Sequence, residues 1–153
     1  MERLTRRYII NSLNNLNLSD PIRYERFYIN DNLRIQKKNN KLEKEILDDN
    51  NKVIEKLKIE EKLFIQLKEE AYCEIIRDSY LCLEDYRISI KKYYGKYEGL
   101  NRVEVEFSSA EEMNCYEKEK WMGKEITNSP LAFDKYLSKL SEEEFKSELN
   151  KYI

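Results

Sequence analysis

The sequence contains no histidine and very little glycine. Its 153 residues include three glycines, Gly95, Gly99 and Gly123, none of which precedes residue 95. A glycine-rich phosphate loop and a dinucleotide-binding fingerprint need closely spaced glycines, and Ser-His-Asp, Cys-His and histidine-zinc sites need histidine. These classes of site are therefore excluded. Any chemistry must use Lys, Arg, Asp, Glu, Tyr and the backbone.

Cysteines and long apolar segments are also scarce. Cys73, Cys82 and Cys115 are widely spaced and odd in number, which predicts small buried hydrophobic residues and neither a disulfide framework nor a metal site. No apolar run reaches the length of about 18 residues that a membrane span needs, and no apolar signal core follows the N-terminal charges. We therefore expect a cytoplasmic protein with no membrane partner.

Charged residues, in contrast, are abundant and nearly balanced. The 28 basic and 30 acidic side chains leave a formal net charge of -2, and 12 Tyr and 5 Phe are spread among aliphatic residues. This composition predicts a folded chain, and the length predicts one domain over residues 1–153. Because neither sign is in excess, no nucleic-acid partner is expected. The composition indicates nothing about the oligomeric state.

The first two thirds of the chain alternate between apolar and polar residues. In Arg102-Val103-Glu104-Val105-Glu106-Phe107, for example, the alternation places apolar side chains on one face of a strand and charged ones on the other. Turn-forming residues such as Asn39-Asn40 separate the runs. The runs predict strands at 3–10, 22–29, 33–38, 41–47, 52–59, 74–83, 86–94 and 101–108.

Helical patterns interrupt this series. Residues 60–71 carry an apolar stripe, and Ser108-Ser109 precedes a run with glutamates in its first turn. Ser129-Pro130 and Ser141-Glu142-Glu143-Glu144 are start signals for two more helices. The whole pattern predicts an α+β fold, an eight-stranded antiparallel β-barrel with outer helices.

If the sheet closes, one polar face of the strands points inward. An eight-stranded barrel with charged inward residues holds a polar or liganded interior. The candidates for this face are Arg3, Thr5, Arg7, Arg34, Gln36, Lys38, Ser89, Lys91, Arg102, Glu104 and Glu106. The alternation by itself favours a second interpretation, an open amphipathic sheet whose polar face is solvated.

The segment 88–127 contains an ordered series of motifs. These are Tyr93-Tyr94-Gly95, Gly99-Leu100, the Glu104-x-Glu106 strand, an acidic helix and Trp121-Met122-Gly123-Lys124-Glu125-Ile126-Thr127. In this order and spacing they resemble the C-terminal half of the CYTH family, the triphosphate tunnel metalloenzymes. Weaker similarity extends toward the N-terminus, where Tyr28-Ile29 and Arg34-Ile35-Gln36 resemble family strands. The resemblance implies an eight-stranded tunnel that takes a triphosphate-bearing small molecule.

The resemblance also implies a set of site residues. In the family, inward basic residues hold the triphosphate and paired glutamates hold a divalent metal, Mg2+ or Mn2+. The implied substrate-binding residues are Arg7, Arg34, Lys44, Arg77 and Lys91, and the implied metal ligands are Glu104 and Glu106. Phosphoryl transfer needs mainly positioning and charge neutralisation, which a site without histidine can supply.

The departures from the family pattern remove acidic residues. The opening E-x-E-x-K strand reads Arg3-Leu4-Thr5-Arg6-Arg7, and the R-x-E-x-E strand is matched by Lys52-Val53-Ile54-Glu55-Lys56. We therefore expect a divergent member that binds triphosphate, polyphosphate or a nucleoside triphosphate, with metal-dependent hydrolysis as the family chemistry. One alternative is a catalytically degenerate regulatory module that binds the same ligands. Another is a structural domain in which Glu104 and Glu106 pair with arginines.

One further basic feature surrounds the turn at 39–40. Lys37, Lys38, Lys41 and Lys44 form a basic hairpin. We interpret it as a solvated turn, with contact to phosphates at a tunnel mouth as the alternative.

Overall fold

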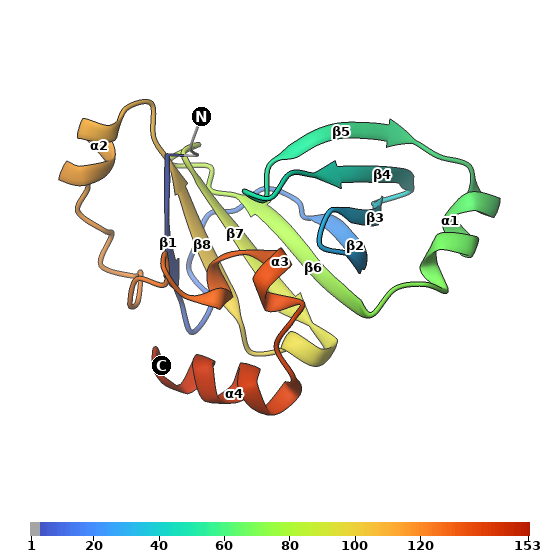
Figure 1. Ribbon diagram of the computed structural model, residues 1–153. Helices are drawn as coiled ribbons and strands as arrows, with labels where there is room; N and C mark the ends of the chain where they lie inside the picture. Colours follow the sequence, from blue (N-terminus) through green and yellow to red (C-terminus); the bar gives the residue numbers. More distant parts are fainter. Residues whose placement is uncertain (1–3) are drawn as a thin grey trace.

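One antiparallel sheet forms the body of the protein (Figure 1), which a computed structural model describes for residues 4–153. Its strands are β1 (Thr5–Ile9), β2 (Ile22–Asn30), β3 (Leu33–Lys38), β4 (Lys41–Leu47), β5 (Val53–Lys58), β6 (Cys73–Leu81), β7 (Ile88–Tyr94) and β8 (Asn101–Glu106). All eight predicted strands are confirmed, with ends that differ by at most two residues. The predicted inward residue Arg3 lies outside the described residues.

The strand order is β1-β8-β7-β6-β2-β3-β4-β5. The predicted closure into a barrel is not confirmed, because within residues 4–153 no hydrogen-bonded pairing joins β1 to β5. Instead, the segment 123–126 lies along the free edge of β1, where the Ile126 N–H donates to the Arg7 carbonyl at 2.8 Å and the Gly123 N–H to the Ile9 carbonyl at 2.6 Å. A Cβ on residue 123 would lie 2.6 Å from that Ile9 oxygen, so only glycine fits.

Within residues 4–153, four α-helices and two short 3-10 helices complete the fold. They are α1 (Glu61–Lys68), η1 (Gly95–Tyr97), α2 (Ala110–Cys115), η2 (Pro130–Ala132), α3 (Asp134–Leu137) and α4 (Glu142–Asn150). The capping box predicted at Ser141 is present, and Ser109 caps α2. The helix predicted after Ser129-Pro130 is instead broken into η2 and α3, because Phe133 between them has an extended backbone.

The outer face of the sheet is apolar where it is covered. Phe27 and Ile35 pack against Phe64 of α1. Tyr8, Ile88, Ile90, Val103 and Val105 form a second cluster, against which Met113 of α2 and Trp121 pack. The free cysteines Cys73 and Cys82 are buried as predicted, whereas Cys115 is exposed. Within the described residues, no helix combines the length and apolar character that crossing a bilayer requires.

The inner face carries Arg7, Arg34, Arg77 and Arg102. The helix α3 lies in front of it near β7 and β8, and α4 lies at one end of the sheet (Figure 1). One end of this face is an apolar layer in which strand residues such as Tyr28 and Ile75 contact Phe145 of α4 and Leu137 of α3. Because side chains alternate along a strand, the next inner-face residues lie about 7 Å further on, and these are the charged ones. The fold therefore places a charged layer directly beside a hydrophobic one.

Candidate functional site

Charged side chains from five strands, β1, β3, β4, β6 and β8, are buried on the inner face. Arg7 is 2% exposed, Arg77 4% and Arg102 3%. Buried charges are stable only when they are paired or bind a ligand. The alternation also favours an open sheet with a solvated polar face. In the part of the chain that the structure describes, hydrogen bonds do not close the sheet, but its polar face is buried, so this interpretation is wrong about solvation.

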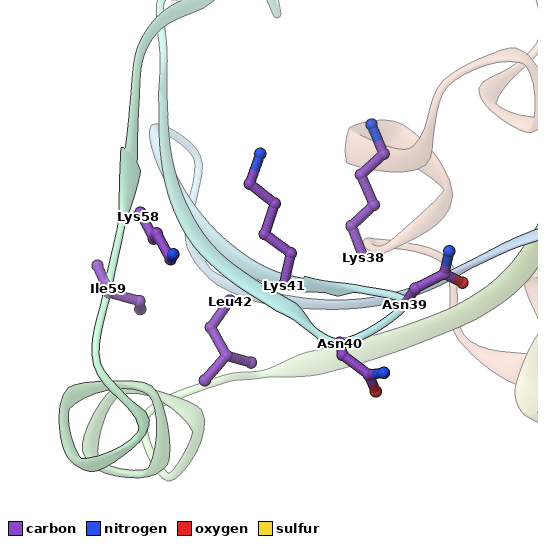
Figure 2. A pocket seen from close by; sticks show the side chains of 7 residues that line it. All are labelled: Lys38, Asn39, Asn40, Lys41, Leu42, Lys58 and Ile59. Carbon is purple, nitrogen blue, oxygen red and sulfur yellow. The ribbon is translucent and has the colours of Figure 1, made fainter.

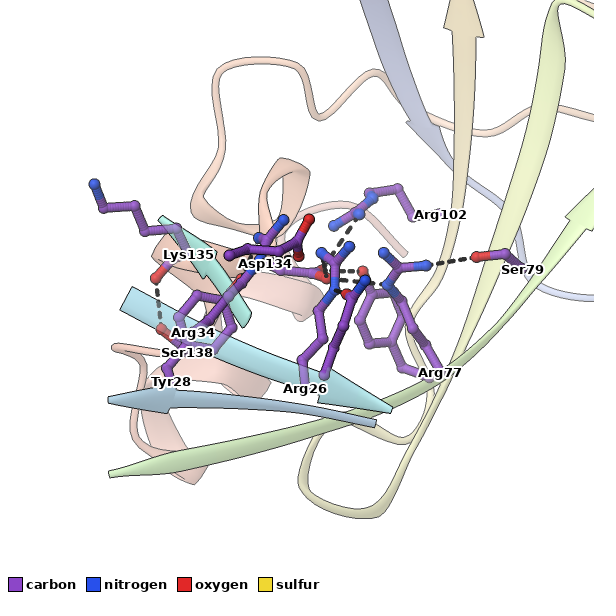
Figure 3. A network of polar contacts seen from close by, with 12 residues as sticks. Arg26, Tyr28, Arg34, Arg77, Ser79, Arg102, Asp134, Lys135 and Ser138 are labelled. Atoms are coloured by element: carbon purple, nitrogen blue, oxygen red, sulfur yellow. Dashed lines mark hydrogen bonds and ion pairs between the residues drawn. The ribbon is translucent and has the colours of Figure 1, made fainter. Parts of the chain in front are cut away.

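Three arginines converge on one carboxylate, that of Asp134 at the start of α3 (Figure 3). Arg26 donates to Asp134 Oδ2 at 2.9 Å, Arg77 to the same oxygen at 3.0 Å and Arg102 to Oδ1 at 3.4 Å. The Tyr93 hydroxyl also donates to Oδ1. Burial raises the pKa of Asp134, but the three guanidiniums outweigh this effect and hold the pKa well below its usual range. Asp134 is therefore an anion held from several directions.

A second cationic group surrounds Glu104. Arg102 Nη2 lies 2.8 Å and Arg7 Nε 3.8 Å from Glu104 Oε2. Burial raises the pKa of Glu104, but Arg102, Lys91 and Arg7 reverse this and hold it far below its usual range. Lys91 donates to Ser89 Oγ at 3.1 Å. Burial lowers the pKa of Lys91 to about 8, against the attraction of Glu104. Lys91 is thus an ammonium whose charge is only partly compensated.

β4 supplies two buried glutamates to the same face. Glu45 accepts a hydrogen bond from Arg34 at 2.9 Å, and Glu43 accepts one from Gln36 at 2.9 Å. Burial raises the pKa of Glu45, but Arg34 and its neighbours lower it below the usual range. This pair was missed because the strand lysine, Lys44, was expected to point inward. Lys44 lies opposite Ile35 and therefore belongs to the outer face.

The structure brings most of the predicted site residues together. Arg7, Arg34, Arg77, Lys91 and Glu104 share the inner face. Glu106 lies on the same face of β8 but is exposed at the end of the strand, and the prediction for Lys44 is corrected to the outer face. The residues that sequence reasoning missed are Arg26, Glu43, Glu45 and Asp134. Glu43-x-Glu45 could have been found as a second E-x-E pattern, whereas no pattern marks Asp134.

The carboxylates do not form a metal site on their own. Among the described residues, no group of three or more His, Cys, Asp or Glu is placed to hold a metal ion. Of the predicted ligands, Glu104 is enclosed by cations and Glu106 lies at the exposed end of β8. Mg2+ and Mn2+ need several available oxygen ligands. The donor set therefore fits an anion better than a divalent cation.

Comparisons with known proteins identify the fold. No protein-family model matches the sequence, and no curated protein matches it. Among the solved structures that match, one is described as the inorganic triphosphatase NE1496, at a TM-score of 0.72, and another as the hypothetical protein NE1496, at 0.70. Each is 17% identical in sequence. The matches cover 92% and 90% of this chain and 97% of each neighbour. The chain therefore has the eight-stranded antiparallel fold of these two structures, in agreement with the fold that the resemblance of residues 88–127 to the CYTH triphosphate tunnel proteins implies.

Proposed function

We propose that the protein binds a linear triphosphate, either inorganic or as part of a nucleoside triphosphate, on its inner face. The observation that carries this proposal is the convergence of Arg26, Arg77 and Arg102 on the single carboxylate of Asp134. Three guanidiniums from three strands supply more positive charge than one carboxylate neutralises. A phosphate offers several charged oxygens to the same donors.

The charge balance of the inner face supports the same conclusion. In its largely buried layer, between the apolar end and the exposed end, six basic side chains of the strands face four acidic ones, which leaves an excess of two positive charges. The basic residues are Arg7, Arg26, Arg34, Arg77, Lys91 and Arg102, and the acidic ones are Glu43, Glu45, Glu104 and Asp134. Charge-assisted hydrogen bonds are strong where water is excluded, and guanidiniums match phosphate oxygens well. The similarity in fold to a protein described as an inorganic triphosphatase supports a triphosphate as the ligand.

Arg77→Gln tests this proposal. We expect the wild-type protein to bind tripolyphosphate, and the variant to bind it more weakly by about 1.5–3 kcal/mol, roughly one to two orders of magnitude, because a charged hydrogen-bond donor is lost. Isothermal titration calorimetry measures the affinity. Arg87→Gln is the matched control, because Arg87 is an exposed arginine paired with Asp85 and Glu112. Failure of the wild-type protein to bind both tripolyphosphate and ATP would refute the proposal.

The lowered pKa of Lys91 predicts a pH dependence of binding. Above about pH 8 the free protein loses the Lys91 proton, and a bound anion restores it by favouring the charged form. Affinity for tripolyphosphate should therefore fall as pH rises from 8 to 10, by at most about tenfold per pH unit. In Lys91→Arg the side chain stays charged over this pH range, so the affinity of the variant for tripolyphosphate should fall less. Protonation of tripolyphosphate itself affects both proteins equally. Parallel affinity curves for the two proteins would contradict this role of Lys91.

Hydrolysis of the bound triphosphate is the second candidate function. It is favoured by the fold shared with the protein described as an inorganic triphosphatase and by the position of Glu104 beside the arginines. Phosphate release from tripolyphosphate that requires Mg2+ or Mn2+ would establish an enzyme. Tight binding without release in the presence of either ion would favour a regulatory binding module.

A further inference from the structure

A cleft of about 520 Å3 opens at the β3–β4 hairpin, beyond the buried arginines. Figure 2 shows the side chains of Lys38, Lys41 and Lys58 around it, from β3, β4 and β5. These three residues define what we call the lysine cleft. Lys38 and Lys41 place it at the end of the inner face opposite the apolar layer, because Lys38 follows Arg34 and Gln36 along the same face of β3. Leu42 and Ile59 also line it and extend it around the hairpin toward the outer face.

The sheet separates the lysines of the basic hairpin into two groups. Lys38 and Lys41 are cross-strand partners on the inner face. Lys37 is opposite Leu42, which packs with Phe27 and Ile35 on the outer face, and Lys44 is opposite Ile35. The hairpin therefore presents Lys38 and Lys41 to the lysine cleft, whereas Lys37 and Lys44 lie on the outer face, where Lys37 lines a separate cleft beside α1.

Positive charge in the lysine cleft exceeds negative charge. Among the residues the structure describes, Glu43 is the carboxylate that pairs with one of these lysines, with its Oε2 3.7 Å from Lys41 Nζ. Glu43 is itself buried and accepts a hydrogen bond from Gln36, so its charge is shared. The fields of ammonium groups that line one cleft add together and attract anions.

Tyr24 connects the lysine cleft to the arginines. It lies opposite Arg77 on one side and opposite Lys38 on the other. Its ring centroid is 4.4 Å from Arg77 Cζ and 5.7 Å from Lys38 Nζ. Arg26 Cζ is 5.2 Å from the same ring. Basic groups therefore follow one another from the Asp134 cluster, past Tyr24, to the lysine cleft.

We propose that the lysine cleft is an extension subsite for a linear polyphosphate longer than a triphosphate. The inference rests on the proposed function: one end of the chain occupies the arginine cluster, and the phosphates beyond it pass Tyr24 and meet Lys38, Lys41 and Lys58. A polyphosphate carries negative charge along its whole length, so each added phosphate finds a cation. Ammonium groups are suited to such a chain and not to an uncharged base, which favours polyphosphate over a nucleotide as the ligand.

The test compares two triple variants by calorimetry with tripolyphosphate and with a longer, size-fractionated polyphosphate. We expect the wild-type protein to bind the longer chain more tightly, with a preference that weakens as salt is added. Lys38→Gln/Lys41→Gln/Lys58→Gln should lose about tenfold or more of the affinity for the longer chain and at most about twofold for tripolyphosphate. The control Lys37→Gln/Lys44→Gln/Lys68→Gln changes the net charge equally but alters the outer face and α1. It should keep the preference for the longer chain.

The outcomes separate this inference from the proposed function. Equal affinity of the wild-type protein for both chains, or equal losses in the two triple variants, would overturn the extension subsite while triphosphate binding stands. ATP affinity that depends on the three cleft lysines, with no such dependence for polyphosphate, would assign the cleft to a nucleotide and also overturn it. Absence of binding to either phosphate chain would refute the proposed function itself.

Discussion

Asp134→Asn is expected to lower the free energy of unfolding by about 3–5 kcal/mol, because it leaves the buried guanidiniums of Arg26, Arg77 and Arg102 without their shared carboxylate. Asp134 is 4% exposed, so water cannot replace the lost charge. Typical domains are stable by only about 5–15 kcal/mol, so this loss would bring the protein close to unfolding.

Urea denaturation measures the effect of Asp134→Asn as a lower midpoint with an unchanged slope. Asp78→Asn is the control. Asp78 is also buried, but the side chain of its ion-pair partner Arg23 is 47% exposed and stays solvated when the pair is broken. The control should therefore lose clearly less stability. Equal stability of Asp134→Asn and the wild-type protein would show that the arginines do not depend on this carboxylate.

Low pH and bound tripolyphosphate should both change the difference in the free energy of unfolding between Asp134→Asn and the wild-type protein. The pKa of Asp134 is lower in the folded state than its ordinary value of 3.8. The stabilisation by ionised Asp134 is therefore fully present above pH 3.8. It is lost only as the pH falls through the pKa that Asp134 has in the folded protein. Tripolyphosphate should stabilise the variant more than the wild-type protein, because the anion replaces the missing charge.

Glu104→Gln is expected to have opposite effects on stability and on binding. It removes the negative charge that Arg102, Arg7 and Lys91 surround. We expect a loss of stability of about 3–5 kcal/mol, since three cations then face one another. Tripolyphosphate should bind the folded variant more tightly, because the net positive charge of the site increases. Urea denaturation and calorimetry measure the two effects.

Glu104→Gln also decides between the two candidate functions. If the wild-type protein releases phosphate in a metal-dependent reaction through Glu104, the variant should bind tripolyphosphate but release little phosphate. Glu74→Gln is the matched control, because Glu74 is an exposed glutamate on β6. Weaker binding of tripolyphosphate by Glu104→Gln, with folding intact, would contradict the charge argument.

The strands could be predicted because their signal is local. Alternation along 33–38, 41–47 and 101–106 indicates which residues share a face of a strand. Turn residues such as Asn39 indicate where a strand ends. Asn39 has a φ of 52°, a conformation that asparagine tolerates. The helix-start signals at Ser109 and Ser141 are equally local, and both were confirmed.

The buried face of each strand is not encoded locally, because alternation alone does not show which of the two faces packs against the rest of the protein. On β4 the choice between Lys44 and its neighbours Glu43 and Glu45 depends on Ile35, which lies opposite Lys44 and packs against Phe64. That packing involves α1, which follows β4 in the chain. A shift of one residue in the alignment of β4 exchanges its two faces. The sequence similarity to the family is weak in this region and does not fix the alignment.

By itself, the sequence determined the eight strands, the residues that share each face, and the fold shared with the triphosphate tunnel proteins. The tertiary structure alone decided what lies across the inner face. Asp134 meets Arg26, Arg77 and Arg102 across separations of 108, 57 and 32 residues. No local pattern encodes contacts over such distances, since they form only when the extended backbone at Phe133 and the packing of α3 bring this carboxylate to the sheet. Because of the same packing, the chain has a formal net charge of only -2 but buries a layer with an excess of positive charge.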